Sequence, residues 1–156
     1  MQANEKMEFA HDGQTGYLVI TRDVRPQMGD VIGLIKVEGP PGMLKRIEAG
    51  ERVAERQVLW QRLWRPTAIQ EAARNILKVA SDKDNSESYP TDFSGPGQVT
   101  GKLVVRRNEK AITLIEEFGG GTVGCEVALP VKLAKKLANT ILAIEVAVPV
   151  LEPESA

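Results

Sequence analysis

The stretch 123–142, VGCEVALPVKLAKKLANTIL, contains the two kinds of periodicity that decide the fold. Its first seven residues alternate between apolar and small or polar side chains, which is the two-residue period of a half-buried strand. Pro130 follows, and apolar residues then recur every three or four positions, as on one face of a helix, with lysines on the other face. The stretch therefore predicts a strand that leads into a helix over 130–142.

Two segments earlier in the chain also have helical periodicity. Over 67–80 an apolar stripe of isoleucine, leucine and alanine repeats at helical spacing, and the segment begins with the spacing of a capping box. Over 43–64 apolar residues recur among many charged ones, with Trp60 and Trp64 four residues apart. We therefore expect helices at 43–64 and 67–80, with both tryptophans on one helix face.

Short apolar, β-branched segments predict the strands. The segments 16–21 and 31–37 flank a proline- and glycine-containing turn, as in a hairpin. A second hairpin is expected from 103–105 and 111–115, with its turn near Asn108. Together with the helices, these strands predict an α+β protein: an antiparallel sheet with three or so helices packed against it.

Segments of low apolar content indicate how the chain is divided. The segment 81–98, SDKDNSESYPTDFSGPGQ, predicts a linker or mobile loop between a hairpin-plus-helices part at 16–80 and a strands-plus-helix part at 99–150. We expect these two parts to share one core, because each alone is small. The polar segment 1–15 predicts a frayed or loop-like start, and the alternation over 144–150 predicts an edge strand.

The composition argues against the commonest kinds of catalytic site. The 156 residues include one histidine, His11, and one cysteine, Cys125, and the net charge is −1. Hydrolytic, redox and metal chemistry needs tuned imidazoles, activated thiolates or clustered ligands. Cys125 has the inward phase of its strand, so we expect a small buried hydrophobe. The sequence therefore predicts no catalytic residue, no metal ligand and no cofactor.

Sequence features also bear on location. A single cysteine cannot form an intramolecular disulfide, which fits a reducing compartment. The polar N-terminal residues lack the apolar core of a signal peptide, and no run approaches the roughly 18 apolar residues of a spanning helix. We therefore expect a cytoplasmic protein with no membrane partner.

A glycine-rich segment, GGGTVG at 119–124, has the G-x-G-x-x-G spacing of dinucleotide-binding loops, with Gly119, Gly121 and Gly124 at the glycine positions. A site of that kind requires a helix to begin inside the loop. The residues that follow alternate as a strand instead, and Pro130 would interrupt the required helix. A flexible strand-to-strand loop explains the glycines, and small-ligand or nucleotide binding there is an alternative hypothesis.

Basic side chains gather on the second hairpin and on one face of the last helix. The candidates for nucleic-acid binding are Arg106, Arg107, Lys110, Lys132, Lys135 and Lys136. Such a surface could follow a phosphate backbone. Single-strand binding normally also uses aromatic side chains for base stacking, and after 81–98 the chain has only Phe118. Solvated charge on a helix exterior is the competing explanation, so nucleic-acid binding is a second hypothesis.

The tryptophans and neighbouring arginines suggest an interface. Trp60, Trp64 and Arg56 form a cluster of residue types that are enriched at interaction hot spots, although tryptophan also suits a core with few large rings. The leading hypothesis is therefore a non-enzymatic interaction or regulatory module. It would form a homo-oligomer or bind another protein through this cluster or an exposed sheet edge.

Overall fold

A computed structural model describes residues 4–11, 14–26, 28–51, 53–85, 87–95 and 99–145. Within them the chain forms two four-stranded antiparallel sheets and three α-helices, which confirms the α+β class but divides the strands between two sheets instead of one. The first sheet has the order β1 (Asn4–His11), β2 (Gln14–Arg25), β3 (Gly29–Glu38) and β4 (Val58–Trp64). The second has the order β5 (Tyr89–Ser94), β6 (Thr100–Arg107), β7 (Ala111–Phe118) and β8 (Val123–Pro130). The helices are α1 (Met43–Glu48), α2 (Pro66–Ala80) and α3 (Val131–Ala143).

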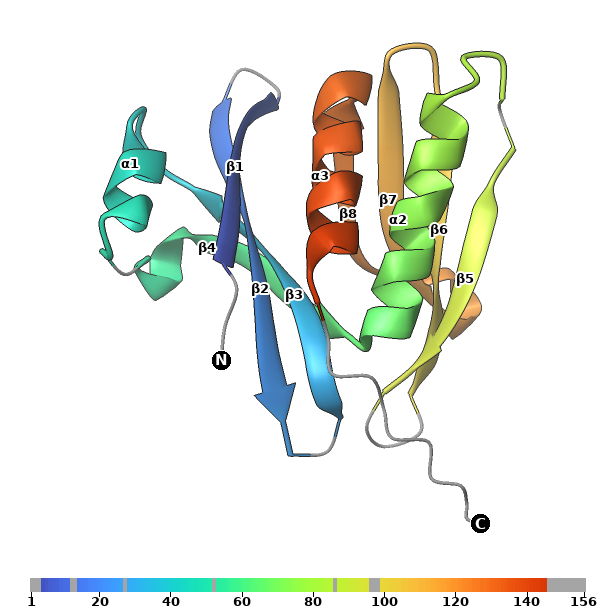
Figure 1. Ribbon diagram of the computed structural model, residues 1–156, viewed down its shortest axis with the longest axis horizontal. Coiled ribbons are helices and arrows are strands. Elements are labelled where there is room, and N and C mark those ends of the chain that lie inside the picture. Colours follow the sequence, from blue (N-terminus) through green and yellow to red (C-terminus); the bar gives the residue numbers. More distant parts are fainter. Residues whose placement is uncertain are drawn as a thin grey trace.

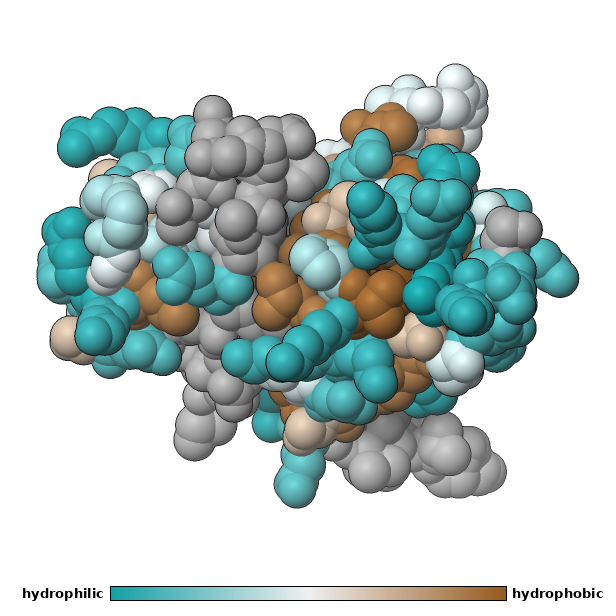
Figure 2. Space-filling model, turned by 90° about the horizontal axis from the view of Figure 1, so that it is seen from above, coloured by the Kyte–Doolittle hydropathy of each residue, from teal (hydrophilic) through white to brown (hydrophobic). Residues whose placement is uncertain are grey.

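The main core lies between the sheets and two of the helices. Helices α2 and α3 lie side by side over one face of the second sheet, and the first sheet lies beyond α3 (Figure 1). Side chains from both halves of the chain bury themselves in one cluster, which includes Leu18, Ile20, Ile32, Leu34, Trp64, Ile69, Ile76, Leu103, Leu114, Leu137 and Ile141. Each fully buried large aliphatic chain stabilises the fold by roughly 1.5–3 kcal/mol. From above, hydrophobic residues gather toward the middle of the helical half and hydrophilic residues around its rim (Figure 2).

The predictions of helices α2 and α3 and of the turn near Asn108 are confirmed. Helices α2 and α3 begin and end within one residue of the expected bounds, because their apolar stripes face the core. The hairpin turn lies at Asn108, whose side-chain oxygen accepts hydrogen bonds from the N–H groups of Lys110 and Ala111. None of the helices in the described part is long and apolar enough to traverse a bilayer.

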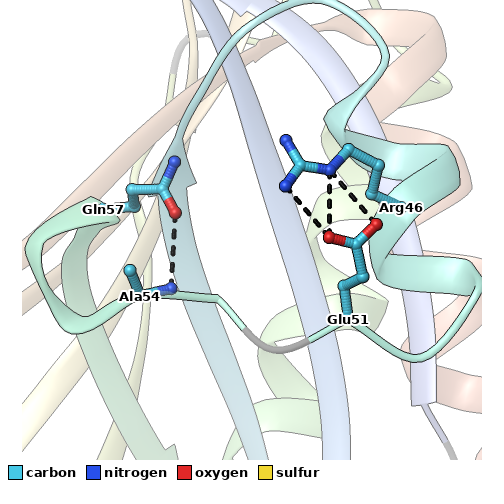
Figure 3. Close-up of polar contacts among 4 residues, drawn as sticks. All are labelled: Arg46, Glu51, Ala54 and Gln57. Atoms are coloured by element: carbon cyan, nitrogen blue, oxygen red, sulfur yellow. Dashed lines mark hydrogen bonds and ion pairs between the residues drawn. The ribbon is translucent and has the colours of Figure 1, made fainter.

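The prediction of one long helix at 43–64 is wrong. Helix α1 has only six residues, and Gly50 then adopts a φ of +99°, a left-handed conformation that glycine tolerates. Figure 3 shows the side-chain contacts of the connection that follows: Arg46 binds Glu51, and the Gln57 carboxamide oxygen accepts a hydrogen bond from the N–H of Ala54. The chain then continues as strand β4. Residues four apart share a face in a strand as well as in a helix, so the tryptophan spacing could not separate the two.

Two polar segments contain strands that the sequence did not predict. Strand β1 pairs along its length with β2 in the segment expected to be loop-like, and β5 pairs with β6 inside the segment expected to be a linker. The inward residues of β5 include Tyr89 and Phe93, which pack against the core. Two rings supply enough apolar contact to order a strand that is otherwise polar. The edge strand expected at 144–150 lies, beyond residue 145, outside the described residues.

Candidate functional site

A buried carboxylate joins the two sheets. Glu116 lies on the helix-facing side of β7, is only 1% exposed, and is the one charged residue among the buried side chains of the described chain. The indole N–H of Trp64 donates to its Oε2 over 2.8 Å, and Nε of Arg62 lies 2.6 Å from its Oε1. Both partners belong to β4, in the other sheet, so these contacts tie the first sheet to the second. Glu117, the next residue, points to the other face and is partly exposed, as the strand period predicts.

The last glycine of the glycine-rich segment makes room for this carboxylate. A Cβ at Gly124 would overlap with Oε1 of Glu116 and would lie 2.7 Å from the Phe118 ring. Gly121 has a φ of +83° between β7 and β8, where Gly119–Gly121 form one 3₁₀ turn and no α-helix begins. The glycine-rich segment therefore forms a loop between two strands, as in the explanation that needs no ligand. Gly119 is exposed, with open space around its α-carbon.

A pocket opens beside the glycine-rich turn. Its volume is about 810 Å³, and it lies between the first turn of α2 and the adjoining ends of β5, β6 and β7. The rings of Phe93 and Phe118 line it edge to face, with centroids 5.9 Å apart, and Gly119 lies at its wall. Arg65 and Thr67 line it from the start of α2. Of the three glycines proposed as ligand-binding, only Gly119 therefore lines this pocket.

The single thiol lies close to the buried carboxylate and is protected. Cys125 is 5% exposed, as its strand phase predicts. Burial, and secondly the negative charge of Glu116, raise the pKa of the Cys125 thiol to about 12. The thiolate, which is the nucleophilic form, is therefore strongly disfavoured in the folded protein.

We expect Cys125 to resist a thiol reagent such as dithionitrobenzoate at pH 8 in the folded protein and to react rapidly in urea. A pKa of about 12 instead of 9.0 lowers the thiolate fraction roughly a thousandfold. Because the folded pKa is the higher one, this thiol also makes the folded state less stable as pH rises above 9 toward 12. Quenched labelling at several urea concentrations measures the reaction rate of the Cys125 thiol. Cys125→Ala should remove the loss of stability above pH 9. Equal labelling rates with and without urea would contradict the assignment.

The basic residues proposed to bind nucleic acid lie in separate parts of the structure. The Arg107 guanidinium donates to the carbonyl oxygens of Val79 and Ala80, over 2.9 and 3.3 Å, and thereby caps the C-terminal end of α2. Arg106 and Lys110 are exposed on the hairpin. The three lysines of α3 instead line a groove of about 920 Å³ together with Arg22. The structure thus groups Lys132, Lys135 and Lys136 with Arg22, and the hairpin residues do not line that groove.

The tryptophan cluster is likewise divided. Trp64 is 1% exposed and belongs to the core, whereas Trp60 is partly buried on β4 and packs against the core from its margin. Arg56 is exposed in the 3₁₀ turn Glu55–Gln57 that precedes β4. Of the three residues of the predicted interface, Trp60 and Arg56 are therefore accessible at the surface, and Trp64 is not.

Sequence reasoning missed the residues that hold the two sheets together, although one signal was present. Ile112, Leu114 and Glu116 share the inward phase of β7, so an acid at that position has to be buried and paired. No group of three or more histidine, cysteine, aspartate or glutamate side chains in the described part of the chain could hold a metal ion together. No protein-family model, curated protein or solved structure matches the chain.

Proposed function

We propose that this protein is a non-enzymatic interaction module that self-associates by pairing β4 with β4 of a second copy. The observation that carries the proposal is the position of β4 at the end of the first sheet, where no other described strand pairs with its outer edge. Leu59, at the point where the register with β3 shifts, is 50% exposed, and Gln61 is exposed as well. An outer strand with free N–H and C=O groups is a template for another strand.

The composition of β4 suits pairing better than that of the edge strands in the second sheet. The β4 sequence VLWQRLW consists mainly of aromatic and aliphatic residues and contains no proline, glycine or acid. Strand β5 carries Pro90 and Asp92, and β8 carries Gly124 and Glu126. Proline, glycine and charge weaken edge pairing, so the outer edges of the second sheet are less suited to accept a partner.

The arrangement of side chains favours a second copy of this chain. An antiparallel pairing centred on Gln61 would place Leu59, which is half exposed, opposite Leu63 of the partner subunit, twice, because the interface is two-fold symmetric. Apolar side chains that face each other across a strand pair stabilise the pairing. A hollow of about 430 Å³, lined by Arg25, Gln61, Arg62 and Leu63, leaves room beside the strand for side chains of the second copy.

We expect the protein to show a concentration-dependent rise from 17.0 kDa toward twice that mass in size-exclusion chromatography with light scattering. Leu59→Lys should keep it monomeric over the same range, because charge on an edge strand opposes pairing. Val24→Lys is the matched control, since Val24 is 60% exposed on β2, away from the outer edge of β4.

The fold of each variant is checked by its thermal unfolding midpoint. A molar mass that stays at 17.0 kDa at every concentration would overturn the proposal. A dimer that Val24→Lys breaks and Leu59→Lys leaves intact would overturn it as well. Acrylamide quenching gives a second measurement: association should shield Trp60 and leave Trp64, which is already buried, unchanged.

A further inference from the structure

We infer that the pocket between the start of α2 and the ends of β5, β6 and β7 binds a small aromatic anion such as an aromatic carboxylate. Its volume of about 810 Å³ lies within the range of small-molecule sites. Its lining combines two aromatic rings and small apolar residues with charged and polar side chains. The side chains and backbone that matter for this inference are Arg65, Thr67, Ala68, Phe93, Gly101 and Phe118.

The aromatic wall of the pocket is held in place by its surroundings. The Phe93 and Phe118 rings meet edge to face at 76°, a preferred geometry for aromatic pairs. A Cβ at Gly101 would lie 2.7 Å from the Phe93 ring. Because glycine has no side chain, the Phe93 ring packs directly against β6. The Arg62 guanidinium lies 5.6 Å from the centroid of the Phe118 ring and is itself paired with the buried Glu116. A preformed aromatic wall reduces the ordering cost of binding another ring.

One cation of the pocket is available to an anionic group on that ligand. The lining includes two cations, Arg65 and Lys102, and two acids, Asp92 and Glu117. Lys102 lies in register between both acids, Asp92 on β5 and Glu117 on β7. Arg65 is exposed and has no side-chain hydrogen bond or ion pair with another residue of the described chain. The first turn of α2 has no acidic side chain. Arg65 is therefore the cation of the pocket that no acid of the described chain holds, and a guanidinium binds a carboxylate through two parallel hydrogen bonds.

The test is a titration of the full chain with 1-naphthoate, followed by the amide chemical shifts of Phe93, Gly101 and Gly119. We expect saturable shifts at these three positions. Arg65→Gln should weaken naphthoate binding about tenfold, because it removes a charge-assisted hydrogen bond. The same variant should leave the binding of the neutral analogue 1-naphthalenemethanol unchanged. Arg106→Gln, an exposed arginine toward the other end of β6, is the matched control and should bind naphthoate as the original chain does.

Three results would overturn the inference. The first is the absence of saturable shifts at these amides at millimolar naphthoate. The second is equal affinity for naphthoate in Arg65→Gln and the original chain. The third is an equal loss in Arg65→Gln and Arg106→Gln, which would indicate a general charge effect. Self-association through β4 is measured separately by molar mass, so either proposal can fail without the other.

Discussion

Gly124→Ala is expected to lower the free energy of unfolding by about 3 kcal/mol. The added Cβ would overlap with Oε1 of Glu116, so either the carboxylate leaves its partners or β8 moves away from β7. The cost of an added methyl in a tight core is typically 1–3 kcal/mol, and disturbance of a buried ion pair increases it. Urea denaturation followed by tryptophan fluorescence measures this change, because Trp64 contacts the same carboxylate.

The chain offers a matched glycine for comparison. Gly119 has nothing within 4 Å of a Cβ placed on it, and its φ is not positive. Gly119→Ala should therefore change the free energy of unfolding by no more than about 0.5 kcal/mol. Equal stability of the two variants would show that Gly124 is not the residue that makes room for the carboxylate.

Glu116→Ala is expected to be the other severely destabilising change, by about 3–5 kcal/mol. It would leave the Trp64 indole N–H without its acceptor and the Arg62 guanidinium without its counter-charge. A buried donor or charge that loses its partner is costly, because water cannot replace that partner. Glu117→Ala is the neighbouring control, since that side chain is partly exposed on the other face of β7, and it should cost no more than about 0.5 kcal/mol.

A double-mutant cycle separates the ion pair from other losses at this position. Arg62→Ala and Glu116→Ala are combined, and the free energies of unfolding of all four proteins are measured in urea. If the ion pair links the sheets, the two changes should couple by more than about 0.5 kcal/mol. Additive effects would mean that Glu116 acts through Trp64 or through packing alone. The Arg62 side chain is 36% exposed and that of Glu116 only 1%. Water therefore screens the attraction between the two charges from the Arg62 side only.

Where a local pattern had one structural meaning, the sequence predicted the element well. The apolar stripes of α2 and α3 fit only a helix, and the turn at Asn108 follows from the side chain that caps it. The alternation in β8 likewise placed Cys125 in the core. Where a pattern had two meanings, the prediction failed. Trp60 and Trp64 share a face in a helix and in a strand alike, and only the end of α1 near Gly50 shows which one forms.

By itself, the amino-acid sequence determined the local elements that have a clear period, the scarcity of catalytic side chains, and the inward phase of Cys125. Tertiary structure alone decided that Glu116 meets Trp64, 52 positions away in sequence, and that Gly124 leaves space for the carboxylate. It also placed β4 at an open sheet edge and Phe93 beside Phe118. Local periodicity depends on neighbours a few residues apart, whereas these contacts depend on strand order, register and the packing of two sheets around shared helices.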